Sequence, residues 1–204
     1  MDAALALCDE GRQPTFAEIA QRALVSRATA YRYFSSVEAL VSEALFERSV
    51  PAPEQAFRPG DSPVEAIGRI ARDFNALLLD DEVALHVMER SFMTVWLDNE
   101  PDARPPRPAR RLQYIGPVLD AVKKELAPAA RKRLAHALAM VMGPEAVLAL
   151  RDVAGASPQE ALAATEWAAS TLLRQALCEA ARAPARQAPA AQAQSPKTRG
   201  RKGA

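Results

Sequence analysis

The stretch TFAEIAQRALVSRATAYRYFSSVEAL, residues 15–40, decides the fold of the N-terminal part of this chain. Thr15 and Glu18 stand at the spacing of a capping box, which satisfies the first backbone N–H groups of a helix. Apolar side chains then recur at i, i+3, i+4 and i+7, so one face of the helix can pack on a neighbour. The pattern predicts a short amphipathic helix that ends near Ala23.

A turn of three residues, 24–26, separates this helix from a second one. Ser26 can cap the second helix, which runs for two turns to Phe34. Two short helices joined by a turn of this length are typical of a helix-turn-helix motif.

The second helix has a packing side and an outward side when it is projected at about 100° per residue. Ala30 and Phe34 share an arc that can face the first helix. The outward and flanking positions carry arginine, small, hydroxyl and phenol side chains, namely Arg27, Ala28, Thr29, Tyr31, Arg32 and Tyr33. In a major groove an arginine can hold guanine with two hydrogen bonds, worth about 1–3 kcal/mol of discrimination. Hydroxyl groups can donate to phosphate oxygens.

The charge of residues 1–50 does not by itself favour nucleic acid. Five arginines stand against seven aspartates and glutamates, a net charge of −2. DNA-binding domains usually present a basic surface. An ordinary amphipathic surface helix therefore stays open as the alternative interpretation.

Composition limits what the whole chain can be. Of its 204 residues 49% are hydrophobic, so a buried core is expected, and the net charge of +1 creates no global attraction to nucleic acid or membranes. Cys8 and Cys178 lie far apart and the two histidines are His86 and His136, so we expect reduced thiols, no metal site and no cofactor. We find no signal peptide, no apolar run of the roughly 18 residues that a membrane span needs, and no catalytic motif. These features predict a cytoplasmic protein that is not an enzyme.

The helix-forming composition predicts an all-α protein without strands. Capping boxes that begin at Thr15, Ser35, Ser62 and Ser157 predict helices that start near residues 16, 36, 63 and 158. Periodicity adds helices over 2–10, 27–34, 82–98, 108–126 and 129–153, the last interrupted by Gly143-Pro144. About nine helices result, with proline-rich breaks at 50–63 and 99–108.

These breaks divide the chain into three predicted parts. Residues 1–48 hold the helix-turn-helix, and residues 49–183 form a helical domain. Residues 184–204 are basic and rich in proline, alanine and glutamine. We expect this tail to be disordered because it has almost no large apolar side chain to bury.

Residues 15–45 resemble the DNA-binding domain of the TetR family of transcriptional repressors. The shared residues are Thr15, Ile19, Ala20, Ala23, Val25, Ser26, Thr29, Tyr31, Tyr33, Phe34 and Glu38-Ala39-Leu40. The resemblance covers about 45 residues if the segment 2–11 is the family's first helix. It implies a three-helix DNA-binding domain in which the short helix after the turn enters the major groove of an operator.

The resemblance also implies roles for single positions. Arg27, Ala28 and Arg32 lie where the family approaches bases, and Thr15, Thr29, Tyr31 and Tyr33 lie where it holds the phosphate backbone.

Two features depart from the family's pattern. Family chains usually have a basic segment before the first helix, whereas this sequence starts at Met1, so either the arm is absent or the true start lies upstream. The residue after Ser36 is commonly a lysine that touches phosphate, and here it is Val37. Both differences remove positive charge from the side that would face DNA.

Residues 142–177 are similar, more loosely, to the family's last two helices, which usually form a four-helix bundle with those of a second subunit. The segment 158–182 is apolar on nearly all sides, so it needs more than one neighbour. We therefore expect a homodimer through the helices near 129–153 and 158–182, which suits an operator with two-fold symmetry. Burial within one subunit is the alternative.

Family members commonly bind a small molecule in the helical domain and then release DNA, so the resemblance implies a small-molecule inducer. The candidate pocket residues are Phe74, Met88, Phe92, Met93, Trp96 and Tyr114, with His86, Arg72 or Gln113 as polar contacts. An apolar cavity of this kind suits a hydrophobic ligand. Plain core packing is the alternative role for each residue.

The combined expectation is a ligand-responsive repressor that binds a palindromic operator as a homodimer. Its C-terminal domain would then serve for ligand binding and dimerisation. The alternative is a helical dimeric protein, a coregulator or interaction protein, whose DNA binding is weakened or lost.

Overall fold

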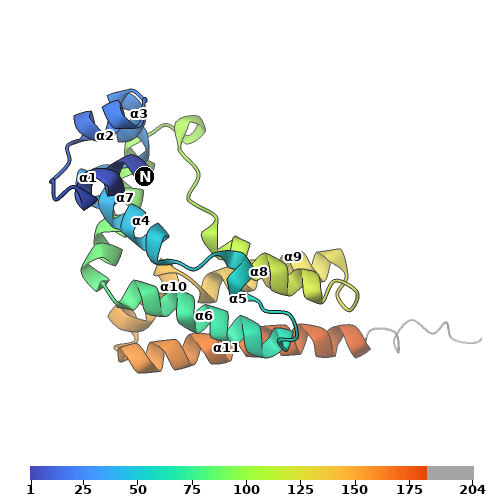
Figure 1. Cartoon of the computed structure of the whole chain (residues 1–204). Coiled ribbons are helices and arrows are strands. Elements are labelled where there is room, and N and C mark those ends of the chain that lie inside the picture. The colour runs from blue at the N-terminus through green and yellow to red at the C-terminus, as the bar shows by residue number, and fades with distance from the viewer. Residues whose placement is uncertain (183–204) are drawn as a thin grey trace, which may run out of the picture.

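The computed structural model describes residues 1–182, and these residues form helices without any strand (Figure 1). The predicted all-α fold, with a helix-turn-helix before a larger helical part, is confirmed. The tail predicted at 184–204 lies outside the described residues.

The N-terminal part has four helices, α1 (Asp2–Asp9), α2 (Phe16–Arg22), α3 (Arg27–Tyr33) and α4 (Val37–Ser49). It has a small core of its own, formed by Ala4, Leu7, Phe16, Ile19, Ala30 and Leu40. Both α2 and α4 pack on α1, and α3 packs on α2. α4 then leads out of this group towards the second part of the molecule (Figure 1).

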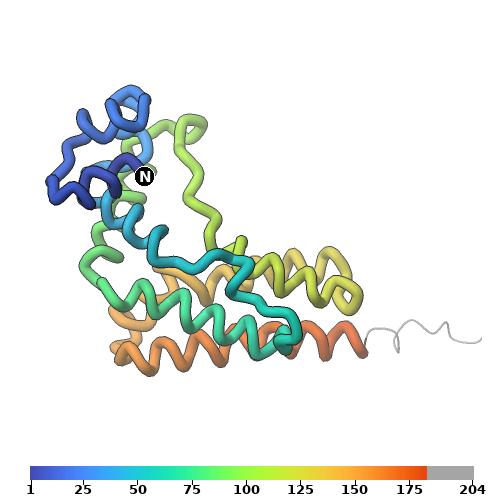
Figure 2. The backbone as a smooth tube through the Cα atoms, viewed as in Figure 1, coloured from blue at the N-terminus to red at the C-terminus, as the bar shows by residue number. Residues whose placement is uncertain are grey.

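The second part is a layered bundle. Its helices are α5 (Pro53–Ala56), α6 (Pro63–Leu79), α7 (Glu82–Asp98), α8 (Arg110–Ala121), α9 (Pro128–Val141), α10 (Pro144–Leu148) and α11 (Pro158–Arg182), with a 3-10 turn η1 (Pro101–Ala103) and a π-helical turn η2 (Ala149–Val153). The tube in Figure 2 shows α6 running alongside α11, and these two helices share the most extensive helix–helix contact.

The close approach of α6 and α11 depends on Gly68. A Cβ atom at this position would lie 2.1 Å from Oγ of Ser170 and 3.0 Å from the carbonyl oxygen of Glu166. Ser170 donates a hydrogen bond from its hydroxyl to the carbonyl oxygen of Val64, at 3.1 Å. The absence of a side chain at Gly68 therefore lets the two long helices come together and bury the centre of the main core.

Most predicted helix starts match, but the capping is not always as predicted. Thr15 and Ser157 form complete capping boxes. The box predicted at Ser35 is wrong, because Ser36 caps α4 by accepting from the N–H of Ala39, at 3.1 Å. The hydroxyl and N–H of Ser35 instead bind Ser91 of α7.

The box predicted at Ser62 does not form, since its side chain makes no cap hydrogen bond. The start of α6 rests on Pro63, whose fixed φ suits the first helical position.

The described residues contain eleven α-helices rather than about nine. One addition is α5, which lies in the first proline-rich break. The other arises because the predicted helix 129–153 is split into α9 and α10 at Gly143, whose φ of +104° ends the first helix. Buried Asn75 holds this break, since it accepts from the N–H of Gly143 at 2.8 Å and donates to the carbonyl oxygen of Val141 at 3.1 Å.

Within residues 1–182, no single helix is long and apolar enough to cross a membrane. Taken together, α9 and the bent continuation through α10 and η2 have the length and composition of a membrane span. No group of three or more histidine, cysteine, aspartate or glutamate side chains in the same range is placed to hold a metal ion.

Candidate DNA-binding surface

The turn between α2 and α3 is tight. The N–H of Val25 donates to the carbonyl oxygen of Ala20 at 3.0 Å, and Ser26 caps α3 by accepting from the N–H of Thr29 at 3.0 Å. Leu24 has a φ of +56° and its side chain is 93% exposed. This left-handed conformation is costly for a leucine, so the turn carries local strain.

Few side chains of α3 pack on the rest of the N-terminal part. Ala30 is its buried residue, and Phe34 packs on the small N-terminal core next to it. The ring of Tyr31 packs on Phe16 of α2, with ring centroids 4.4 Å apart. The rest of the helix surface stays open, and Arg27, Ala28 and Arg32 are exposed.

The arginines of the N-terminal part fall into two groups. Three are paired with nearby carboxylates: Arg12 with Glu10 and Glu18, Arg22 with Glu10, and Arg48 with Asp9. Arg27 and Arg32 of α3 have no carboxylate partner among residues 1–182. The two unpaired guanidinium groups are thus both on the helix that the sequence predicts to read DNA.

The negative net charge of residues 1–50 is therefore not located on α3. Glu43 and Glu47 of α4 face the second part of the molecule, where both pair with Arg110. Asp9, Glu10 and Glu18 are matched by other arginines, and α3 itself carries two arginines and no acidic residue. A basic patch of this kind attracts phosphate, even though the domain as a whole is acidic.

Three of the four predicted phosphate-binding hydroxyls, those of Thr15, Thr29 and Tyr33, have hydrogen-bond partners within the protein. Thr15 Oγ1 donates to Oε2 of Glu18 at 2.9 Å and accepts from the Glu18 N–H. The backbone N–H of Thr15 bonded to Glu18 lowers the pKa of that carboxyl group, with the Thr15 hydroxyl adding to the effect. Thr29 shares a hydrogen bond with Ser26, and the hydroxyl of Tyr33 accepts from Arg32 at 3.2 Å.

Val37 occupies the position where the resemblance implied a lysine. Its side chain is half-buried and packs on the small N-terminal core. The missing positive charge is therefore exchanged for apolar contact at the start of α4.

Two of the links between the N-terminal part and the second part were not revealed by sequence patterns. One is the pair of hydrogen bonds from Ser35 to Ser91, both 3.0 Å long. The other is the ion pair from Arg110 to Glu43, 2.5 Å, in which both side chains are largely buried. The four arginines of residues 104–111 were the one available signal, but their partners are distant in sequence.

The predicted pocket residues do not line one cavity. Phe74, Met88 and Phe92 border a small cavity of about 50 Å³. Phe74 and Tyr114 border a second, of about 330 Å³. Phe92 reappears with Met93 and Trp96 in a third, of about 600 Å³.

The predicted polar contacts lie away from these three cavities. His86 donates from Nδ1 to the carbonyl oxygen of Glu82 at 2.6 Å, and its Nε2 lies 3.5 Å from Asp152. Arg72 pairs with Asp73 and Glu166, and Gln113 borders a separate shallow pocket.

Comparison with known proteins gives one finding. Residues 1–44 match the family model described as "Bacterial regulatory proteins, tetR family". No curated protein and no solved structure gives a significant match to the chain. The matched range contains α1, α2 and α3 and the beginning of α4. Residues 1–44 therefore form a helix-turn-helix domain of the TetR type.

Proposed function

We propose that the protein is a ligand-responsive repressor that binds a palindromic operator as a homodimer in the bacterial cytoplasm. The observation that carries DNA recognition is the pair of exposed arginines, Arg27 and Arg32, without carboxylate partners among residues 1–182. On a helix after a capped three-residue turn, such side chains can enter a major groove and bind guanine.

In the proposed complex, α3 supplies both kinds of contact, and Thr15 at the start of α2 adds a further phosphate contact. Arg27, Ala28 and Arg32 approach bases, while Thr15, Thr29, Tyr31 and Tyr33 hold phosphates. Thr15 must share its hydroxyl with Glu18 to do so, because the capping box already uses it. We therefore expect Thr15 to contribute less than the two tyrosines.

The proposed dimer uses α11 with the segment from α9 to η2. Three large apolar side chains on these elements are exposed: Met140 by 74%, Val153 by 86% and Trp167 by 70%. Exposed apolar side chains of this size are typical of a surface that another protein covers. Two copies joined here would present two α3 helices to the two halves of an operator.

The oligomeric state tests this surface. Trp167→Glu is expected to convert the dimer into monomers in sedimentation velocity, because the interface would then bury a charge. Val83→Glu is the matched control, since Val83 of α7 is 76% exposed on an element outside the proposed interface. A wild-type monomer, or equal behaviour of the two variants, would contradict the proposed interface.

The proposed ligand response requires a site in the helical part. Phe74, Met88, Phe92, Trp96 and Tyr114 stay the candidate residues. The cavities that they border differ in size, and the one at Trp96 is large enough for a drug-sized molecule.

The first experiment is fluorescence anisotropy of the protein on DNA fragments from around its own gene, at two salt concentrations. We expect sequence-selective binding that weakens as salt rises, because phosphate contacts release counterions. Absence of binding at either salt concentration would favour the alternative, a helical interaction protein that has lost DNA binding.

A further inference from the structure

The proline-rich segment between α7 and α8 carries a series of arginines that bind other parts of the chain. We name residues 104–111 the arginine strap; it contains Arg104, Arg107, Arg110 and Arg111. In Figure 2 this part of the chain descends from beside the DNA-binding helices to α8. The strap therefore lies between the two parts of the molecule.

Two guanidinium groups of the strap cover aromatic rings of α7. Cζ of Arg104 lies 3.7 Å from the centroid of the Trp96 ring, and Cζ of Arg107 lies 4.5 Å from that of Phe92. Both distances are within the range of a cation–π interaction. The aromatic side of α7 thus already binds cations, and these cations belong to the protein itself.

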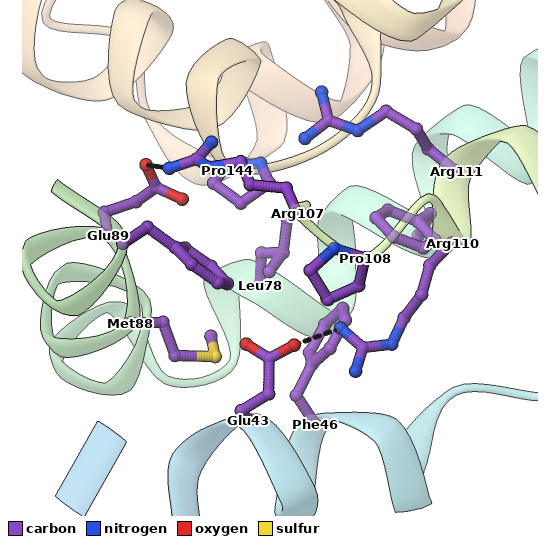
Figure 3. A pocket seen from close by; sticks show the side chains of 12 residues that line it. Glu43, Phe46, Leu78, Met88, Glu89, Arg107, Pro108, Arg110, Arg111 and Pro144 are labelled. Carbon is purple, nitrogen blue, oxygen red and sulfur yellow. Dashed lines mark hydrogen bonds and ion pairs between the residues drawn. The ribbon is translucent and has the colours of Figure 1, made fainter. Parts of the chain in front are cut away.

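Two carboxylates, buried Glu43 and partly buried Glu89, border the same cavity as these rings. Figure 3 shows Glu43 from α4 and Glu89 from α7 pointing into the space between the helices and the strap. Glu89 pairs through Oε2 with Arg107 at 2.7 Å, but its Oε1 is buried and has no hydrogen-bond partner. A buried carboxylate oxygen without a partner is unfavourable, so this position calls for a donor or a positive charge.

An open cavity of about 600 Å³ adjoins these groups. Tyr33 and Phe34 of the DNA-binding part form one wall, and Trp96 with Met93 forms another. Its volume is in the range of drug-sized ligands. Three carboxylates and two guanidinium groups border it, and each of these carboxylates also pairs with an arginine of the chain.

We propose that this cavity is an effector site for a lipophilic organic cation. Such a cation would take the places of Arg104 and Arg107 on the aromatic rings and bring a positive charge to Oε1 of Glu89. The guanidinium groups of Arg104 and Arg107 occupy this cation site in the absence of ligand, and the ligand competes with them.

The site is connected to the DNA-binding part in two ways, and this step rests on the proposed function. Tyr33, a candidate phosphate contact, is part of the cavity wall. The strap continues to Arg110, which binds Glu43 of α4 at 2.5 Å. Displacement of the strap would therefore disturb the anchor of α4 and favour a state that binds DNA less well.

Calorimetric titration with tetraphenylphosphonium, with tetraphenylborate as an anion of the same shape, tests the site without DNA. We expect the cation to bind at least about tenfold more tightly than the anion, because attraction between a cation and a largely desolvated carboxylate is worth at least that much. Equal binding of the two ions, or no binding of the cation, would overturn the proposal.

Two variants sharpen this test in opposite directions. Glu89→Gln keeps the side-chain shape and should weaken cation binding by about tenfold while anion binding does not fall. Arg107→Ala removes the internal competitor and should strengthen cation binding. A purely structural role for Arg107 predicts weaker binding instead, and that result would overturn the competition. Arg48→Ala, far from the cavity and paired with Asp9, should bind like the wild type.

Anisotropy on operator DNA with and without tetraphenylphosphonium separates this inference from the proposed function. A protein that binds DNA but not the cation would retain its function and lose this site. A protein that binds the cation but no DNA would retain the site and lose the repressor function. The expected result is DNA binding that the cation weakens in the wild type and weakens less in Glu89→Gln.

Discussion

The arginines of α3 and those of the strap have the same side chain but opposite surroundings. Arg27 and Arg32 of α3 are exposed and have no carboxylate partner among residues 1–182. Strap arginines are instead engaged: Arg107 and Arg111 pair with Glu145, and Arg110 pairs with Glu43. The contrast shows that the role of an arginine depends more on its ion-pair partners than on its residue type. An arginine without a carboxylate partner can bind an external ligand, whereas one with such a partner stabilises the fold.

The largest effect on stability is expected at the buried end of the strap. Arg110→Ala leaves the carboxylate of Glu43 uncompensated, and Glu43 is only 2% exposed. Removal of one partner of a buried ion pair costs about 3–5 kcal/mol. Urea unfolding should show a loss of about this size in the free energy of unfolding.

Replacing both partners tests the reason for that loss. The double variant Glu43→Leu with Arg110→Met should recover most of the stability, because it leaves no unpaired charge. A change of less than about 1 kcal/mol in the free energy of unfolding for Arg110→Ala alone is typical of surface ion pairs. That result would contradict a stabilising role for the buried pair of Arg110 with Glu43.

A gain of stability is expected in the turn before α3. Leu24→Gly removes the left-handed strain at a φ of +56° and loses little contact, because the leucine side chain is exposed. The gain should be about 0.5–1 kcal/mol after the greater backbone freedom of glycine in the unfolded chain is subtracted. Thermal unfolding of the two proteins measures it, and a lower melting temperature for Leu24→Gly would show that the turn is not strained.

The exposed arginines should matter little for stability. The double variant Arg27→Ala with Arg32→Ala is expected to change the free energy of unfolding by less than about 0.5 kcal/mol, as is usual for exposed surface positions without an ion pair. A loss comparable to that of Arg110→Ala would erase the distinction between the two groups of arginines.

A small pH effect is expected where α7 meets η2. The hydrogen bond to the carbonyl oxygen of Glu82 raises the pKa of His86; burial opposes this effect, and Asp152 adds to it. Because the folded pKa lies above the ordinary value of 6.5, the stabilisation is complete below pH 6.5 and is lost as the pH rises through the folded pKa. His86→Ala should flatten this part of the melting-temperature profile.

The effect must be modest because His86 is exposed and solvent screens its pair with Asp152. His136→Ala is the matched control, since His136 is exposed on α9 and forms no ion pair within residues 1–182. If His86→Ala leaves the pH dependence of the melting temperature unchanged, His86 is not the group that causes it.

Features that depend on neighbours in sequence could be predicted. The interval 82–98 matches α7, and the starts of α2, α4, α6 and α11 lie within one residue of the prediction, because capping residues and proline act locally. The face of α3 that carries Arg27 and Arg32 also follows from helical periodicity alone.

Features that depend on distant partners could not be predicted. The sequence does not show that Ser35 binds Ser91, or that Arg110 binds Glu43. The proline-rich strap has no helical or strand periodicity of hydrophobic residues, so its contacts could not be predicted from the sequence. The candidate pocket residues share an apolar character, which does not tell a residue packed in the core from one that borders a cavity.

The most direct test of the account compares the DNA affinity of three proteins by fluorescence anisotropy on one selected operator. We predict that Arg27→Ala with Arg32→Ala weakens binding by about a hundredfold or more, since each arginine bound to guanine contributes about 1–3 kcal/mol. Arg48→Ala, whose arginine already pairs with Asp9, should bind nearly as the wild type does. Equal affinities of all three proteins would contradict the assignment of α3 as the helix that reads DNA.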